Sequence, residues 1–575
     1  MPHPTDDERI ARAEAWLTQD PDPETRAELA AIIALVRAGD AAASADLASR
    51  FDDRLAFGTA GLRGEIAAGP NRMNRVLVAQ GAAGLAAYLL ERASAAGGTG
   101  AGGAPSVVVG YDGRRNSRVF AHDVAEVMAG AGVRAVLLPR LLPTPVLAFA
   151  VRHLDTSAGV MITASHNPPN DNGMKVYLGG DDGGAQIVAP ADAEIAAHIS
   201  RIAASTAVPD LPRGAVETAD ESVVDAYVAA TAAVASAPTA QPKVVYTAMH
   251  GVGWETLQRV LEAAGFAAPA LVSAQIEPDA RFPTVAFPNP EEPGAMDLAF
   301  ETARAEGADL VIANDPDADR LAVAIPDPAS TDGYRRLTGN EVGLLLGLQV
   351  AERVASRAGS TDAGSPRGTL ACSIVSSPGL EAIARAHGLD FRATLTGFKW
   401  ISRAPGLVFG FEEALGFLVN PDTVRDKDGI SAAVAFLSLA SRLAGEGRTV
   451  ADHLDEVVER FGAFDSAQVS IRVTDLTRIA DVMARLRAEP PTEVGGIRVE
   501  RIDDLATGAD GYPPADVLRL VFDGGARVMV RPSGTEPKLK VYIDAAATEG
   551  SMRERRAAAS EAVARLEAGM RELVA

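Results

Sequence analysis

Cysteine is nearly absent from this sequence. Its 575 residues include one cysteine, Cys372, so no disulfide can form within the chain. A single thiol is consistent with a reducing compartment, and we expect a cytoplasmic protein.

Basic residues are also in short supply. Lysine and arginine together number 54 against 76 aspartates and glutamates, which gives a formal net charge of −22. Such a negative charge argues against a broad surface that binds nucleic acid or anionic membranes. An anionic substrate would therefore have to bind a local group of arginines and lysines.

Long apolar runs are missing too. No segment approaches the roughly 18 apolar residues that a membrane-spanning helix needs. The segment Met1–Glu8 is acidic and lacks the apolar region of a signal peptide. With 47% hydrophobic and 23% charged residues, the composition is that of a globular protein. We therefore expect no membrane and no nucleic acid among its partners.

The sequence does contain a repeated alternation of short apolar segments and helical segments. Its length corresponds to about three to five domains. Strands are predicted over residues 106–110, 133–138 and 158–162, then 243–247, 270–273 and 309–313, then 369–374 and 407–411. Helices are predicted after the capping pair Asn116–Ser117, from Pro143–Pro145, and over 254–264, 339–353 and 380–386. This order predicts three α/β units with mainly parallel sheets and helices on both faces.

Both ends of the chain differ from this alternation. Residues 7–37 show helical periodicity. From about Phe464, strands are predicted over 468–473, 517–522, 527–530 and 539–543, and a long helix begins near Glu549. That order predicts an α+β domain with an antiparallel sheet. The expected domains are residues 1–212, 213–326, 327–460 and 461–575.

The first loop that carries chemistry follows the strand predicted at 158–162. Residues 163–169 contain Ser165 and His166, and two prolines stiffen the loop. Ser165 is therefore a candidate phosphoryl carrier, with His166 as a candidate catalytic neighbour. The esterase motif Gly-x-Ser-x-Gly is excluded, because Thr163 and Asn167 stand where its glycines would be. An ordinary turn serine remains the alternative.

The second such loop follows the strand predicted at 309–313. It carries an aspartate at every second position: Asp315, Asp317 and Asp319. Pro316 disfavours a helix here, and alternation in an extended loop would direct the three carboxylates to one side, as a hard divalent cation requires. An EF-hand is excluded, because Arg320 and Pro326 occupy its glycine and glutamate positions. An aspartyl phosphatase, which also begins Asp-x-Asp after a strand, and a solvated acidic turn remain alternatives.

Residues 531–538 form a candidate phosphate-binding loop between two predicted strands. Arg531 offers a bidentate fork to phosphate. Gly534 permits close approach of the backbone, and Ser533 and Thr535 can donate hydrogen bonds. A hairpin loop of ordinary turn residues is the alternative.

Residues 409–417 hold two carboxylates between glycines and aromatic residues. Unpaired buried carboxylates are costly, and their oxygens accept sugar hydroxyls well, so Glu412 and Glu413 are candidate sugar-binding residues. Lys399 could reach the same site, although a surface lysine is the alternative. Arg63, in the Gly-rich loop 58–64, and Lys175 are weak signals when taken alone.

Together the four loops resemble those of the α-D-phosphohexomutase superfamily, which carries a serine loop, a metal loop, a sugar loop and a phosphate loop in this order. The resemblance covers nearly the whole chain. It implies four domains around a central cleft, namely three related mixed α/β sheet domains and a smaller C-terminal α+β domain. The segments Thr59–Arg63 and Gly410–Ala414 look like those of long-chain phosphoglucomutases.

The resemblance also implies roles for residues. Ser165 would be phosphorylated and would join the three aspartates as a ligand of Mg²⁺. Arg63 and Lys175 would act as acid–base or charge-stabilising groups, and Glu412 would bind sugar hydroxyls. The other phosphate and the remaining cation positions of the cleft would involve Arg320, Lys399, Arg531, Ser533, Gly534 and Thr535.

The implied activity is that of a phosphoglucomutase or phosphomannomutase. Phosphoserine would give its phosphoryl group to a hexose phosphate, and the resulting 1,6-bisphosphate would turn round and return the other phosphate. Glucose 1,6-bisphosphate would act as activator, and the enzyme would be a monomer or homodimer. A phosphopentomutase, a sugar-bisphosphate synthase, an Asp-nucleophile phosphatase and a non-catalytic sugar-phosphate binder are the alternatives.

Two features test this interpretation. The family's sugar loop often reads Glu-x-Ser, whereas here Glu412 is followed by Glu413 and Ala414, which removes one hydroxyl that could contact the sugar. The mutase mechanism also requires the oxygen of Ser165 to lie within about 10 Å of the three aspartates, since one ion must reach both.

Overall fold

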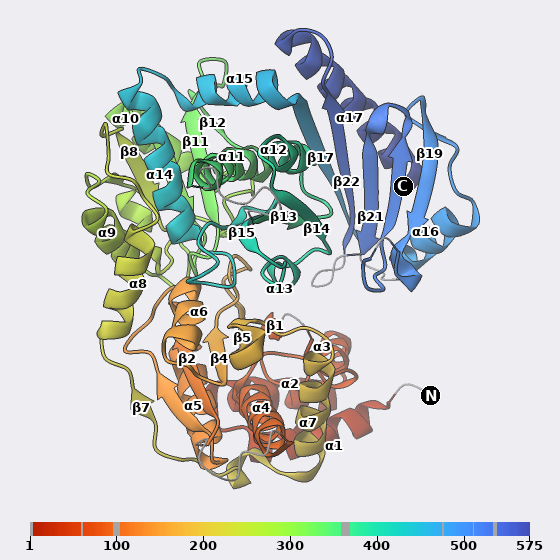
Figure 1. The fold of residues 1–575 in the computed structure, drawn as a ribbon. Coiled ribbons are helices and arrows are strands. Elements are labelled where there is room, and N and C mark those ends of the chain that lie inside the picture. Colours follow the sequence, from red (N-terminus) through yellow and green to blue (C-terminus); the bar gives the residue numbers. More distant parts are fainter. Residues whose placement is uncertain are drawn as a thin grey trace. The chain divides into compact units, whose positions relative to one another are not determined.

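The structure is a computed structural model that describes residues 4–58, 61–95, 104–357, 368–473, 477–509, 511–532 and 538–574. Many of its helices and strands are labelled in Figure 1. The chain divides into two compact units: residues 1–335 with 420–435, and residues 336–419 with 436–575. Within the described residues, no helix combines the length and the apolar character needed to cross a membrane.

The first unit begins with three helices: α1 (Asp6–Gln19), α2 (Pro23–Arg37) and α3 (Ala41–Phe51). The helical periodicity of residues 7–37 is thus interrupted at residues 20–22. Asp22 accepts a hydrogen bond from the amide of Glu24, and Pro23 occupies the first turn, where its missing amide costs nothing. Both residues start a new helix and prevent continuation of α1.

The first α/β domain contains a mixed sheet with the order β1-β5-β4-β2-β3-β7, and β6 pairs with β5. Strands β2, β3, β4 and β7 are parallel, whereas β5 runs antiparallel to both β4 and β1. The strands are β1 (Leu62–Glu65), β2 (Ser106–Tyr111), β3 (Arg134–Leu137), β4 (Ala158–Ile162), β5 (Asp171–Leu178), β6 (Ala185–Gln186) and β7 (Glu217–Thr218). The helices are α4 (Arg75–Ala95), α5 (Ser117–Gly130), α6 (Thr144–His153) and α7 (Ala191–Ser205).

The predicted strands of this domain are confirmed, and their side chains are almost fully buried, as expected for a parallel sheet. One capping prediction is wrong. Asn116 stands at the N-cap of α5 with a φ of 63° and makes no capping hydrogen bond with its side chain. The Ser117 hydroxyl donates instead to Asp112 Oδ1 at 2.6 Å, which ties the start of α5 to the end of β2.

The second sheet has the order β12-β11-β10-β8-β9, in which β8, β9 and β10 are parallel and β11 is antiparallel to β10. Its strands are β8 (Val244–Thr247), β9 (Ala270–Leu271), β10 (Leu310–Asn314), β11 (Leu321–Pro326) and β12 (Tyr334–Arg336). The accompanying helices are α8 (Ser222–Ala232), α9 (Gly253–Ala263) and α10 (Asp297–Glu306).

The third sheet belongs to the second unit and has the order β14-β13-β15-β16, with β16 antiparallel to the rest. Its strands are β13 (Thr369–Ser373), β14 (Asp390–Thr394), β15 (Leu407–Glu412) and β16 (Gly416–Leu418). The helices of this part of the chain are α11 (Gly339–Arg357), α12 (Gly379–Ala386), α13 (Phe398–Ile401), α14 (Gly429–Gly445) and α15 (Val450–Phe461). The first residues of α14 belong to the first unit.

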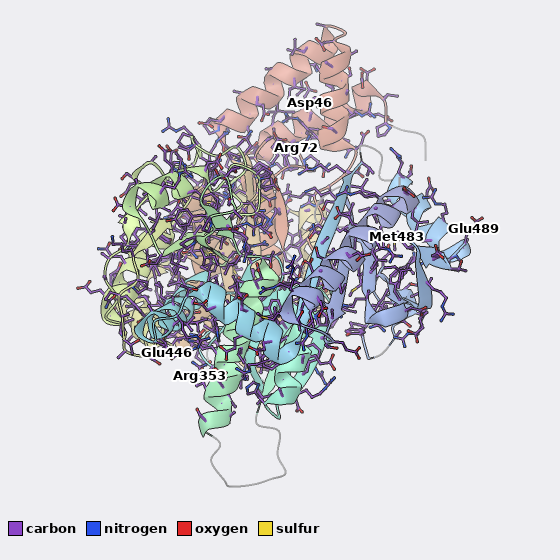
Figure 2. All side chains as sticks on the ribbon, turned by 90° about the horizontal axis from the view of Figure 1, so that it is seen from above. Asp46, Arg72, Arg353, Glu446, Met483 and Glu489 are labelled. Atoms are coloured by element: carbon purple, nitrogen blue, oxygen red, sulfur yellow. The ribbon has the colours of Figure 1, made fainter. Side chains whose placement is uncertain are left out.

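The fourth sheet is antiparallel, with the order β17-β22-β21-β20-β19-β18. Its strands are β17 (Ala463–Arg472), β18 (Glu493–Val494), β19 (Ile497–Asp504), β20 (Leu518–Phe522), β21 (Arg527–Pro532) and β22 (Lys538–Ala547), and its helices are α16 (Thr477–Ala488) and α17 (Met552–Val574). Met483 of α16 is buried, whereas Glu489 beyond its end is exposed (Figure 2). Three mixed α/β sheets and this α+β sheet confirm the predicted fold class.

Candidate active site

The serine loop, residues 163–169, leaves the end of β4 and turns sharply at Ser165. Ser165 has a φ of 52°, in the left-handed region that residues other than glycine seldom adopt. Its amide donates to the Thr163 hydroxyl at 2.8 Å, which closes the turn. Ser165 is only 3% exposed, so the loop rather than solvent determines where its hydroxyl points.

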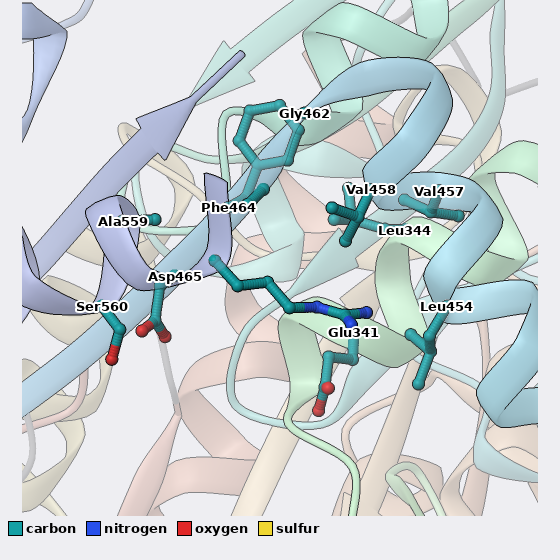
Figure 3. A pocket seen from close by; sticks show the side chains of 12 residues that line it. Glu341, Leu344, Leu454, Val457, Val458, Gly462, Phe464, Asp465, Ala559 and Ser560 are labelled. Carbon is teal, nitrogen blue, oxygen red and sulfur yellow. The ribbon is translucent and has the colours of Figure 1, made fainter. Parts of the chain in front are cut away.

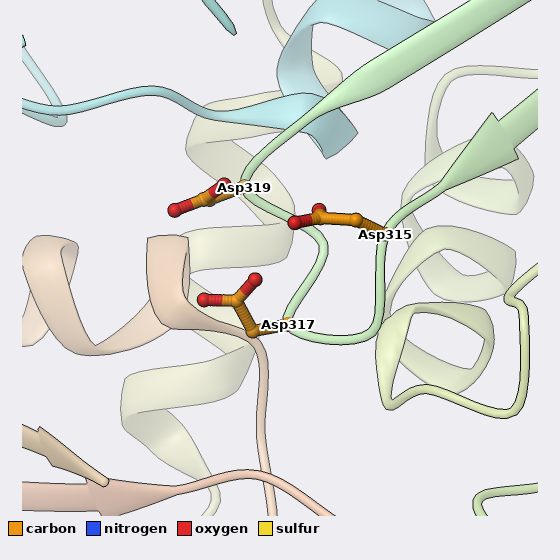
Figure 4. A group of neighbouring side chains, drawn as sticks. All are labelled: Asp315, Asp317 and Asp319. Carbon is orange, nitrogen blue, oxygen red and sulfur yellow. The ribbon is translucent and has the colours of Figure 1, made fainter. Parts of the chain in front are cut away.

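The acidic loop, residues 315–319, connects β10 to the antiparallel strand β11. The amide of Ala318 donates to the Asp315 carbonyl at 2.8 Å, which makes the turn tight. The three carboxylates converge, as Figure 4 shows, and one oxygen from each lies within 4.8 Å of the others. All three are buried, so the loop concentrates negative charge where water cannot screen it.

The structure brings these two loops together. Ser165 Oγ donates to Asp315 Oδ2 at 2.9 Å, and it lies 3.2 Å from His166 Nδ1. The requirement that Ser165 lie within about 10 Å of the aspartates is therefore confirmed. Burial and the nearby cation Arg320 keep the pKa of His166 well below its ordinary value, so the imidazole beside Ser165 is neutral.

Cations from three parts of the first unit surround the aspartates. Lys175 of β5 places Nζ 2.7 Å from Asp317 Oδ2 and 2.8 Å from Asp319 Oδ2. Lys427, which precedes α14, lies 3.3 Å from Asp319 Oδ2, and Arg320 Nε lies 3.8 Å from Asp319 Oδ1. Ion pairing of this kind offsets the free-energy cost of burying so many carboxylates.

The pKa values reflect this balance of burial and charge. Burial, with Asp317 and Asp319 close by, raises the pKa of Asp315 well above its ordinary value. Burial also opposes ionisation of Asp319, but Lys175 and Lys427 outweigh it and lower the pKa of that carboxyl. Burial lowers the pKa of Lys175, yet Asp317 and Asp319 more than compensate and raise it overall, so the lysine stays cationic.

Two carboxylate oxygens of the acidic loop are available to bind a cation. Asp317 Oδ2 accepts hydrogen bonds from Lys175 and from the Thr144 hydroxyl. The Oδ1 atoms of Asp317 and Asp319 are buried, and no donor among the described residues hydrogen-bonds to them. Buried acceptors normally have a partner. A donor set made only of oxygens, with the Ser165 hydroxyl beside it, fits a hard divalent ion such as Mg²⁺.

The structure also locates Arg63, the last predicted catalytic residue. It lies on β1, and its Nη1 donates to Asn167 Oδ1 in the serine loop at 3.2 Å. Strand β5 aligns Arg63 with Gly173 on one side and Lys175 with Met161 on the other. The predicted catalytic residues therefore lie together in the first unit.

Three contacts at this site escaped the sequence analysis. Thr144 and Lys427 touch the acidic loop, and Arg114 donates to backbone carbonyls of the serine loop. A signal for Arg114 did exist, because Asp112-Gly113-Arg114 follows β2 just as the two chemical loops follow β4 and β10. Lys427 stands between two aspartates, Asp426 and Asp428, in a segment that sequence patterns place in the third domain.

Four of the predicted substrate-binding residues form a second group, within the second unit: Lys399, Glu412, Glu413 and Arg531. Arg320, also predicted to bind substrate, lies instead beside the acidic loop of the first unit. Arg531 Nη1 donates to the Thr396 hydroxyl at 2.6 Å, and Glu412 Oε1 accepts from the Gly397 amide at 2.5 Å. Lys399 follows on α13, with Nζ 6.0 Å from the centre of the Trp400 ring. These two hydrogen bonds connect Thr396 to β21 and Gly397 to the end of β15.

Glu413 belongs to the same group but is held differently. Its Oε2 accepts hydrogen bonds from Ser373 at 3.1 Å and Ser376 at 3.0 Å. Burial and the neighbouring Glu412 raise the pKa of Glu413 to about 7. The predicted phosphate-loop residues Ser533, Gly534 and Thr535 lie outside the described residues.

A separate cavity of about 320 Å³ lies in the second unit, among α11, α15, β17 and α17 (Figure 3). Its described lining is Glu341, Leu344, Leu454, Val457, Val458, Gly462, Ala463, Phe464, Asp465, Arg556, Ala559 and Ser560. None of the predicted site residues is among them, so this cavity is distinct from both groups.

Comparison with known protein families gives four consecutive matches. Residues 54–206, 225–328 and 338–461 match the α/β/α domains I, II and III of phosphoglucomutase/phosphomannomutase, and residues 469–562 match the C-terminal domain of the same family. The serine loop falls in the first match and the acidic loop in the second.

Individual proteins show the same similarity. The chain is 52% identical over 475 residues to a "probable phosphomannomutase" of Haemophilus influenzae, covering 82% of this chain and 93% of that protein. It is 35% identical over 520 residues to a phosphoglucomutase of Staphylococcus epidermidis, covering 85% and 90%. A solved phosphoglucomutase/phosphomannomutase family protein of Burkholderia thailandensis shares the fold, with a TM-score of 0.67, 20% identity and coverage of 91% and 97%.

Proposed function

The chain belongs to the phosphoglucomutase/phosphomannomutase family and is an isomerase, and we propose that it moves a phosphoryl group between C1 and C6 of a hexose phosphate through phosphorylated Ser165. The observation that carries this proposal is the 2.9 Å contact between Ser165 Oγ and Asp315 Oδ2. A hydroxyl held against a buried group of carboxylates can pass a phosphoryl group to and from a site where a cation neutralises it.

Residues of the first unit would each supply part of the chemistry. Neutral His166, 3.2 Å from Ser165 Oγ, can accept the hydroxyl proton when phosphate arrives. Lys175 and Arg63 would stabilise charge on the transferring group, since both lie at this site and Lys175 is held cationic. Transfer to Ser165 from a bisphosphate would leave a monophosphate, and the reverse transfer would regenerate the bisphosphate.

We propose that Asp315, Asp317, Asp319 and Ser165 hold Mg²⁺. The two buried Oδ1 atoms that accept no hydrogen bond from the part of the chain that the structure describes support this ligand set. When bound, Mg²⁺ would neutralise the phosphoryl oxygens and so lower the barrier to transfer.

We propose that the group in the second unit contacts the parts of the substrate that do not react. Glu412 would bind sugar hydroxyls with Glu413 beside it, and Arg531 would bind the other phosphate with Ser533, Gly534 and Thr535. Lys399 would add positive charge in this group, and Arg320 would add it beside the acidic loop of the first unit. The hydrogen bonds from Arg531 to the Thr396 hydroxyl and from the Gly397 amide to Glu412 support a shared binding surface within the second unit. Glucose 1,6-bisphosphate is the proposed activator.

The direct test is Ser165→Ala against wild type, with Ser205→Ala as control. Ser205 is an exposed serine at the end of α7, whose hydroxyl donates to the Arg201 carbonyl at 2.9 Å and lies 3.3 Å from the Thr206 hydroxyl. Conversion of glucose 1-phosphate and mannose 1-phosphate to the 6-phosphates, with Mg²⁺ and glucose 1,6-bisphosphate present, should fall at least about 10³-fold in Ser165→Ala, because loss of a nucleophile removes the covalent route. Ser205→Ala should match wild type.

The assay also separates the other candidate activities. Faster turnover of ribose 1-phosphate than of either hexose phosphate would indicate a phosphopentomutase. Net release of inorganic phosphate with Ser165→Ala unaffected would indicate a phosphatase that uses an aspartate of the acidic loop, and would overturn the proposal.

A further inference from the structure

We propose that Arg114 is the positioning residue that holds Ser165 in the geometry needed to carry a phosphoryl group. The inference rests on the proposed function of Ser165. Arg114 makes no contact with the reacting hydroxyl itself, and it acts through the backbone of the serine loop.

The contacts of Arg114 span the serine loop. Its Nη2 donates to the carbonyls of Ser165 and Asn167, each at 2.6 Å. Its Nη1 donates to the carbonyls of Pro168 at 2.8 Å and Asp171 at 3.2 Å. The four terminal N–H groups of one guanidinium therefore hold four carbonyls of the loop and of the strand that follows it.

The guanidinium of Arg114 is itself held in place by Asp112 and Phe282. Asp112 Oδ2 lies 3.6 Å from Arg114 Nε, and both side chains are about 1% exposed. Asp112 Oδ1 accepts from the Arg114 amide at 3.0 Å, so the same carboxylate shapes the turn that carries the arginine. On another side the ring of Phe282 lies 5.0 Å from the guanidinium carbon. A buried charge with these partners has little freedom to move.

Ser165 needs such a hold because its backbone is strained. A non-glycine residue in the left-handed region costs about 1 kcal/mol or more and persists only where surrounding contacts impose it. Arg114 holds the Ser165 carbonyl by a hydrogen bond, while Ser165 Oγ donates to Asp315. A lysine at position 114 would keep the charge but has one nitrogen and no planar fork, so it could not serve the same carbonyls.

The test is Arg114→Lys in the full chain, with Mg²⁺ and glucose 1,6-bisphosphate. Two quantities are measured: the single-turnover rate of phosphorylation of Ser165, and kcat and KM for glucose 1-phosphate. We expect the phosphorylation rate and kcat to fall together by about 10²-fold, because displacement of a reacting group by about 1 Å has that effect, while KM changes less than roughly twofold. The matched control is Arg115→Lys, whose side chain is exposed and pairs with Glu24 at 3.0 Å; it should behave as wild type.

Two further variants keep the test valid if Arg114→Lys fails to fold. Asp112→Asn retains Oδ1 for the turn but removes the charge beside Arg114 Nε, and Phe282→Leu removes only the ring. Both should lower the phosphorylation rate by about tenfold or less, again without raising KM.

The outcomes separate this inference from the proposed function. Phosphorylation of Ser165 in wild type and at an equal rate in Arg114→Lys would overturn the role of Arg114 alone. A loss that appears wholly in KM would overturn it too. Absence of phosphoserine in wild type would overturn the proposed function and with it this inference.

Discussion

At the scale of single residues, the site is defined by groups whose burial is costly unless something compensates for it. Asp315, Asp317 and Asp319 are all at most 1% exposed. Lys175 compensates for two of these carboxylates, and Asp315 pairs with the Ser165 hydroxyl. The remaining Oδ1 atoms of Asp317 and Asp319 are what a divalent ion would satisfy.

A substitution in the acidic loop tests this compensation. Asp317→Asn removes one charged ligand but leaves an oxygen for the Thr144 hydroxyl, so the fold should survive. At a Mg²⁺ concentration about 100 times its Kd, wild type should gain about 2.7 kcal/mol of stability over the metal-free protein, and Asp317→Asn should lose most of that gain. Thermal unfolding with Mg²⁺ and with EDTA measures both.

The control for this experiment is Asp332→Asn, which alters an exposed aspartate on the loop after β11. It should retain the whole Mg²⁺-dependent rise in Tm. If Asp317→Asn retained it as well, the acidic loop would not be the site of the ion.

At the scale of elements, one antiparallel strand organises the catalytic side chains. Strand β5 pairs with β4, whose end leads to Ser165, and with β1, which carries Arg63. Lys175 lies on β5 itself. Gly173 of this strand pairs with Arg63, and its carbonyl accepts from the Thr163 amide at 3.2 Å.

A small side chain at position 173 should therefore disturb both β1 and the serine loop. A Cβ at this position would lie 2.7 Å from the Leu62 carbonyl oxygen and 2.8 Å from that of Thr163. Because these are backbone atoms, Gly173→Ala must push β1 and the serine loop apart. We expect a loss of about 1–3 kcal/mol in stability and of at least about tenfold in kcat, measured by thermal unfolding and steady-state kinetics.

Gly81→Ala is the matched control. Gly81 lies on α4, and a Cβ there would meet side-chain atoms of Leu62 on β1 and Met174 on β5 at 3.4 Å, which is ordinary contact. Since alanine favours the helix more than glycine does, stability should stay level or rise. Equal activity of Gly173→Ala and wild type would show that the alignment of β1 with the serine loop does not matter for turnover.

At the scale of the whole molecule, the sequence allowed much of the fold to be predicted because buried strands of parallel sheets are short apolar segments with polar loops at their ends. The strands that lead into Ser165 and Asp315 were found in this way. Strand β5 was not, since it begins with Asp171, Asn172 and Gly173, which are typical of turns.

The missed contacts have a common physical reason. Arg114 binds backbone carbonyls. Every residue has such a carbonyl, so the side-chain types of its partners give no sign of the contact. Lys427 reaches Asp319 because residues 420–435 return to the first unit, where Tyr177 also donates to Asp426 at 2.8 Å. Sequence patterns report local periodicity, whereas this return depends on tertiary packing. The predicted domain boundaries after residues 212, 326 and 460 remain predictions.

The most direct measurement of the central claim is the phosphoryl group on Ser165 in the intact chain. Wild type is treated with phosphatase, mixed with Mg²⁺ and labelled glucose 1,6-bisphosphate, stopped rapidly and mapped by peptide mass spectrometry. We predict one labelled phosphoryl group on the peptide that contains Ser165, which is discharged into sugar bisphosphate when glucose 1-phosphate is added. Label on an aspartate of the acidic loop, or no label on the chain while substrate is turned over, would contradict the account.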